Sequence, residues 1–227
     1  MSSFVPANSS LITLVAIVGS LCCLTAGAIG LVFELTRPPA STQAAELGTM
    51  EQADRWRTWN ADRIFPRMQG QGARLYAVRL GIAQESGCAD GLNPVAQAIV
   101  WEPGCERVLR ATYSDRNGSL LATVAIVVMR DEHAAASVAE AGLAGPRPAA
   151  FPGTLAARFG DAQAQQHVME RQGRYLVMAA VGYPDGRPAL AHAARSVFGF
   201  AGRLVDDTLL PLASAGDPCR AVEVVSC

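Results

Sequence analysis

The longest apolar run of the chain lies near its beginning, at residues 11–33, where LITLVAIVGSLCCLTAGAIGLVF contains no charged residue. A helix of this length extends about 35 Å, enough to cross the roughly 30 Å of hydrocarbon in a bilayer. Residues 1–10 contain no Lys or Arg, whereas a cleaved secretory signal begins with a basic region. We therefore predict a permanent transmembrane helix over residues 11–36, with residues 1–10 as a short cytoplasmic tail.

Small residues recur on one side of this predicted helix. Ala26 and Gly30 are four positions apart, and such a pair lets two membrane helices approach closely. They are a candidate helix–helix interface, although the same spacing also arises by chance in a span rich in Ala and Gly.

The next segment, residues 37–60, is mostly polar and rich in helix-forming residues after two consecutive prolines. We predict a juxtamembrane stalk helix here. Trp56 and Trp59 are three positions apart and share a face of that helix. They are a candidate interface, either with the membrane surface, which favours Trp, or with the folded domain, and we favour packing against the domain.

Residues 61–210 alternate between strand and helix patterns. Tyr76, Val78, Leu80 and Ile82 have the period of two that indicates a half-buried strand over residues 74–84. Residues 93–101 follow with Asn93 at a helix start and Pro94 at the first helical position. Two β-rich arms then flank Arg116-Asn117-Gly118, and Asn-Gly between such arms predicts a hairpin with a type I′ turn.

The remaining elements repeat this order. Residues 132–143 read as a helix, residues 167–171 and 174–183 as a second hairpin around Gln172-Gly173, and residues 188–207 as an amphipathic helix. Hairpins between helices predict an α+β domain. We expect an antiparallel sheet of about five strands with helices covering one face, followed by a C-terminal tail over residues 211–227.

Four cysteines lie outside the predicted span. They are Cys88, Cys105, Cys219 and Cys227, and of the three possible pairings we favour Cys88–Cys105 and Cys219–Cys227, because each closes a short loop. A zinc site and free buried thiols are the alternatives, but neither pair has the usual spacing of zinc ligands. Disulfides imply an oxidising compartment, so we place the C-terminal domain outside the membrane, although Arg37 beside the span leans weakly the other way.

Composition limits the function further. The formal net charge is −1 and every basic residue is Arg, so no basic field indicates nucleic acid binding. The three histidines, His133, His167 and His192, have no partner at a metal-ligand spacing, and no phosphate loop or nucleophile elbow is present. We predict no catalytic, cofactor-binding or metal-binding residue.

One weak cluster of cations remains. Arg171, Arg174 and Arg187 lie beside predicted turns, and they are candidates for contact with an anionic envelope group or simply solvated turn charges.

Several segments together carry a resemblance. GCADGL at residues 87–92, the hairpin at 101–129, AAVGYPDGRPA at 179–189 and the closing DPCRAVEVVSC make the chain similar to an uncharacterised family of actinomycete proteins. That resemblance implies one N-terminal membrane span and an exported α+β domain with paired cysteines, and it implies no activity.

The sequence therefore predicts a membrane-anchored extracytoplasmic binding or accessory module of the bacterial envelope that is not an enzyme. Its expected partners are the lipid bilayer, through residues 11–33, and an envelope protein complex. The alternatives are an envelope enzyme with an unrecognised site and a single-span transmembrane sensor or regulator.

Overall fold

A computed structural model describes residues 50–70, 76–142, 145–188 and 194–214, all within one compact unit that begins at Gly48. The predicted tail and span, with Ala26 and Gly30, lie outside the described residues, as do Cys219 and Cys227. Among the described residues, no helix has both the length and the apolar character needed to cross a bilayer.

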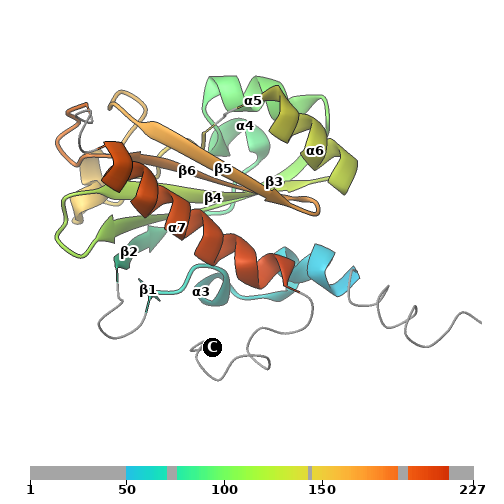
Figure 1. Cartoon of the computed structure of the whole chain (residues 1–227), viewed down its shortest axis with the longest axis horizontal. Helices are drawn as coiled ribbons and strands as arrows, with labels where there is room; N and C mark the ends of the chain where they lie inside the picture. The colour runs from blue at the N-terminus through green and yellow to red at the C-terminus, as the bar shows by residue number, and fades with distance from the viewer. Residues whose placement is uncertain (1–49, 71–75, 143–144, 189–193, 215–227) are drawn as a thin grey trace, which may run out of the picture. The chain divides into compact units, whose positions relative to one another are not determined.

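The centre of the unit is one antiparallel sheet (Figure 1). Its strands stand in the order β1-β2-β3-β4-β6-β5, and their bounds are β1 Met68–Gln69, β2 Ala77–Ile82, β3 Cys105–Asp115, β4 Leu121–Met129, β5 Gln166–Gln172 and β6 Tyr175–Gly182. The α+β class and the antiparallel pairing are confirmed. The strand missing from the prediction is β1, whose two residues are too short to show a period.

Both predicted hairpins are present. In the β3–β4 loop the backbone N–H of Gly118 donates to Asp115 O at 3.1 Å, and Asp115 Oδ1 accepts from the N–H groups of Ser119 and Leu120. Only Gly118 takes a positive φ, of 66°, so the type I′ turn predicted for Asn117-Gly118 is wrong. The side chain of Asp115 stabilises a longer loop instead.

The predicted alternation of β2 is also wrong. Ala77 is fully buried and Val78 is 38% exposed, whereas the period of two places Val78 on the buried face. The pairing with β3 shifts between Arg79 and Gly81, and such a bulge turns Leu80 and Ile82 to opposite faces, where they join different clusters.

Helices cover both faces of the sheet, whereas the sequence predicted one covered face (Figure 1). On one face lie the helix at residues 50–58, α3 (Ala61–Ile64) and α7 (Ala194–Ala213); on the other lie α4 (Cys88–Gly91), α5 (Pro94–Trp101) and α6 (Glu132–Ala141). A short 3₁₀ helix, Leu155–Arg158, closes a third cluster around Leu121. Every residue of β4 and β6 is buried, so both faces of these strands need a cover.

The predicted starts of α5 and α6 agree with the structure, whereas the predicted end of α7 does not. Asn93 Oδ1 accepts from the N–H of Ala96 at 2.8 Å and begins α5 as predicted. Asp131 begins α6 in the same way, and the hydrogen bond from the N–H of Ala134 lowers the pKa of its carboxyl group. In contrast, α7 continues beyond the predicted end at residue 207 and contains Pro211.

Candidate functional site

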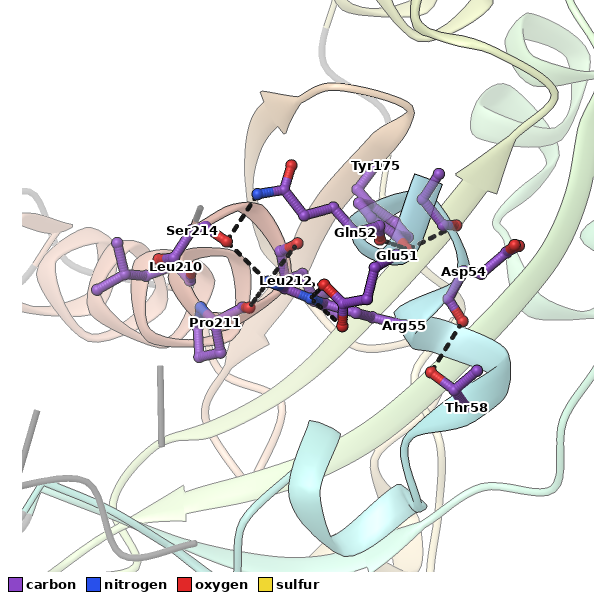
Figure 2. A network of polar contacts seen from close by, with 11 residues as sticks. Glu51, Gln52, Asp54, Arg55, Thr58, Tyr175, Leu210, Pro211, Leu212 and Ser214 are labelled. Carbon is purple, nitrogen blue, oxygen red and sulfur yellow. Dashed lines mark hydrogen bonds and ion pairs between the residues drawn. The ribbon is translucent and has the colours of Figure 1, made fainter. Parts of the chain in front are cut away.

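The helix at residues 50–58, expected as part of a stalk, is fixed to the end of α7 by a buried arginine (Figure 2). Arg55 is fully buried, forms an ion pair with Glu51 at 2.7 Å, and donates to the backbone oxygens of Pro211 at 2.6 Å, Leu212 at 3.3 Å and Ser214 at 2.9 Å. The last carbonyl groups of a helix have no partner within it, and the guanidinium group supplies donors to several of them at once.

The side chains of Gln52 and Tyr175 also hold this helix in place. Gln52 Nε2 donates to Ser214 O at 2.8 Å, and the hydroxyl of Tyr175 on β6 donates to the backbone oxygens of Gln52 at 2.6 Å and Ala53 at 2.9 Å. Burial raises the pKa of Tyr175 to about 12, so its hydroxyl keeps the proton that it donates. We call Glu51, Gln52, Arg55, Tyr175 and Ser214 the Arg55 clasp.

The two tryptophans of this segment pack against the domain, which confirms the favoured interpretation. Trp56 and Trp59 are both half-buried against the cluster beneath α7. Arginine side chains lie over their rings: Arg57 is 4.6 Å from the ring centre of Trp56, and Arg63 is 3.7 Å from that of Trp59. Residues 50–60, predicted as the end of the stalk, are thus an integral part of the folded unit.

Next to these tryptophans is a groove of about 470 Å³. It lies between the N-terminal helix, α3 and the strands β2 and β3, and its lining residues are Trp56, Arg57, Trp59, Ala61, Ile64, Phe65, Ile82, Ala83, Glu85, Leu109 and Arg110. We call it the tryptophan groove. Eight of these eleven residues are apolar, and Arg57, Glu85 and Arg110 are charged, so the groove offers both apolar and polar contacts.

Three charged residues line the groove; Arg57 and Glu85 form ion pairs, and Arg110 Nη1 donates to the backbone oxygen of Arg147 at 2.8 Å. Arg57 forms ion pairs with Asp54 at 3.8 Å and Glu106 at 3.6 Å, and Glu85 pairs with Arg107 at 2.8 Å. Arg57 and Glu85 are both substantially exposed, so the rim carries both signs of charge. This arrangement suits an apolar group held against the tryptophans, with polar contacts at the rim.

The predicted Cys88–Cys105 disulfide is present, with a Cα–Cα distance of 6.2 Å. It joins the start of α4 to the start of β3 and thereby encloses α4 and α5.

The three arginines proposed as an anion contact do not form one site. Arg171 and Arg174 lie at the β5–β6 turn, and Arg187 lies beyond the other end of β6. Each has a carboxylate partner: Glu132 at 3.4 Å for Arg171, Glu106 at 2.6 Å for Arg174, and Asp185 at 3.3 Å for Arg187.

The histidines are also separated. His133 is exposed on α6, His167 is half-buried on β5, and His192 lies outside the described residues. Burial lowers the pKa of His167. Within the described ranges, no group of three His, Cys, Asp or Glu side chains is arranged to hold a metal ion.

Comparison with known proteins gives no match to a protein family, to a curated protein or to a solved structure. The resemblance to the actinomycete family therefore stays a prediction, and the site is argued from its own geometry.

Proposed function

We propose that this protein is a membrane-anchored extracytoplasmic module of the bacterial envelope, and that it acts by binding rather than by catalysis. The tryptophan groove is its binding site. The observation that carries the proposal is the set of apolar side chains that line this groove, with Trp56 and Trp59 beside a rim of mixed charge. Tryptophan and arginine are the residues most enriched among the strongest contacts of protein interfaces.

The proposed anchor limits where the ligand is found. Residues 37–49 separate the predicted transmembrane helix from the helix that carries Trp56, and thirteen residues reach at most about 45 Å when fully extended. The groove would therefore meet a partner that lies in the membrane or close to its outer surface. An envelope protein that presents an extended apolar segment fits both the position and the lining.

Cross-linking in intact cells tests this proposal. A photoreactive benzoylphenylalanine is placed at Ala61 or Ala83, both of which line the groove, and at Ala162, an exposed residue outside it. We expect a protein adduct from Ala61 and Ala83 and none from Ala162. Absence of an adduct at both groove positions would contradict the proposal.

A blocking variant makes the test sharper. Ala61 is exposed, so Ala61→Trp is accommodated by the fold and places a bulky ring in the groove. We expect it to abolish the adduct formed from position 83, whereas Ala162→Trp leaves that adduct unchanged. An adduct that persists with Ala61→Trp would place the contact outside the groove.

A further inference from the structure

A second exposed surface lies on the opposite side of the sheet from the tryptophan groove, on α5 (Figure 1). The buried residues of α5, Ala96 and Val100, pack against the sheet. Its outer residues are also apolar: Trp101 is 71% exposed, Val95 is 62% exposed, and Pro94 and Ala98 are exposed beside them. A surface helix normally directs polar residues to solvent, so this arrangement calls for a partner. We call Pro94, Val95, Ala98 and Trp101 the α5 face.

The α5 face is held rigidly. The Cys88–Cys105 disulfide encloses α4 and α5, Asn93 begins the helix, and Leu92 and Val100 are fully buried beneath it. An apolar group presented on a fixed element loses little conformational entropy on binding, and this favours a contact centred on Trp101.

Hydrogen bonds fix how α6 lies beside α5. Asn93 precedes α5, and its N–H donates to the oxygen of Gly145, which follows α6. Arg130 precedes α6, and its N–H donates to the oxygen of Gly104, which follows α5. The two helices therefore run in opposite directions. Glu132 at the start of α6 lies toward the Trp101 end, and Glu140 near the end of α6 lies toward the Val95 end.

Exposed carboxylates lie on the elements that border the α5 face. They are Asp90 on α4, Glu102 at the end of α5, and Glu132 and Glu140 on α6. Glu132 pairs with Arg171, whereas Asp90, Glu102 and Glu140 form no ion pair within the part of the chain that the structure describes. Among the cations near these elements, Arg130 pairs with Asp131 at 3.1 Å and Arg147 pairs with Asp161 at 3.0 Å, whereas Arg110 interacts with the charge of Asp90. Glu102 and Glu140 therefore leave the rim of the α5 face negative near each end of the helix.

We propose that the α5 face binds a protein surface whose apolar centre is surrounded by Arg or Lys. Charge complementarity argues for this occupant, because a basic rim on the partner would meet Glu102 and Glu140. Two copies of this chain joined through the α5 face would bring like charges together, as a two-fold interface repeats the same patch on both sides. An anionic membrane surface would be repelled by the same carboxylates.

The test is photo-cross-linking in intact cells from benzoylphenylalanine placed at Ala98, in the full-length chain. We expect an adduct with another protein, and we expect Glu102→Lys combined with Glu140→Lys to reduce its yield at least about tenfold, as removal of a strong interface contact does. Trp101→Ala, at an exposed position, should reduce it to a similar extent. The variant with Glu170→Lys, an exposed carboxylate on β5 away from the face, is the matched control and should retain the adduct.

Each other outcome overturns the proposal. A dimer of this chain would identify a second copy as the occupant, and a lipid adduct would identify the membrane. An adduct whose yield is unchanged by Glu102→Lys combined with Glu140→Lys would exclude a basic partner. The absence of any adduct at Ala98 would show that the α5 face binds no protein. The groove is probed separately from Ala61 and Ala83, so failure at Ala98 does not affect the proposed function, nor does failure at the groove affect this inference.

Discussion

Arg55 is the residue on which the attachment of the N-terminal helix depends most. We expect Arg55→Met to lower the free energy of unfolding by about 3 kcal/mol, because it removes the donors to Pro211 O and Leu212 O and leaves Ser214 O with Gln52 Nε2 alone. Urea unfolding of the two proteins measures the difference.

Arg57→Met is the matched control, since Arg57 lies on the same helix, and its exposed ion pairs contribute about 1 kcal/mol at most. A loss of stability no larger for Arg55→Met than for Arg57→Met would show that the Arg55 clasp does not hold the helix.

His167 makes stability depend on pH. Burial lowers its pKa below the ordinary value of 6.5, so the unfolded chain binds a proton more readily than the folded one. The contribution of His167 is present above pH 6.5 and is lost as the pH falls below it. We expect urea unfolding to show stability decreasing from pH 7 to pH 5, and His167→Gln to reduce this slope.

His133→Gln is the control for that measurement, because His133 is exposed on α6. An unchanged slope in His167→Gln would mean that other groups cause the acid sensitivity.

At the scale of single residues, the sequence indicates pairs by spacing but does not show distant partners. Trp56 and Trp59 are recognised because three positions along a helix place them on one face. Arg55 is missed because an arginine in a polar segment is ordinarily solvated, and its partners are backbone carbonyls about 160 residues later in the chain, which no side-chain pattern reveals.

The elements show the same division between local and long-range causes. The helix start at Asn93 and the hairpin around Gly118 depend on neighbouring residues, and the sequence predicts both. The bulge in β2 depends on its pairing with β3, and the continuation of α7 through Pro211 is accompanied by contacts from Arg55. The second covered face follows from β4 and β6, which are almost entirely apolar and buried throughout. The sequence shows this apolar pattern, but the pattern does not indicate which helices cover each face.

The Cys88–Cys105 disulfide is the element-scale feature most open to test. It closes a loop with a sequence separation of 17, and in the chain-entropy description a loop of this size stabilises by about 3 kcal/mol. We expect Cys88→Ala combined with Cys105→Ala to lower the free energy of unfolding by that amount in urea. The unmodified protein in reductant should match the double variant, and a difference below about 1 kcal/mol would show that α4 and α5 are held without the bridge.

On the scale of the whole molecule, the Arg55 clasp joins the beginning and the end of the described part of the compact unit. Ser214, which follows α7, accepts hydrogen bonds from Gln52 and from Arg55, and Arg55 is in turn paired with Glu51 (Figure 2). A pull on the proposed membrane anchor would therefore act on α7 as well as on the N-terminal helix. The tryptophan groove, which the same helix borders, would keep a fixed relation to the anchored end of the unit.

The location of the domain is tested most directly with a single exposed thiol. Ala162 is exposed in a turn, so Ala162→Cys provides a reactive group at little structural cost. If the domain is extracytoplasmic, a membrane-impermeant maleimide added to intact cells labels Ala162→Cys more strongly than the parent chain. Lysis before labelling should then increase the labelling of Ala162→Cys only slightly. The labelling of the parent chain measures any reaction of the native cysteines and is subtracted. Additional labelling of Ala162→Cys that appears only after lysis would place the domain in the cytoplasm, and would remove both the proposed orientation and an extracytoplasmic partner for the groove.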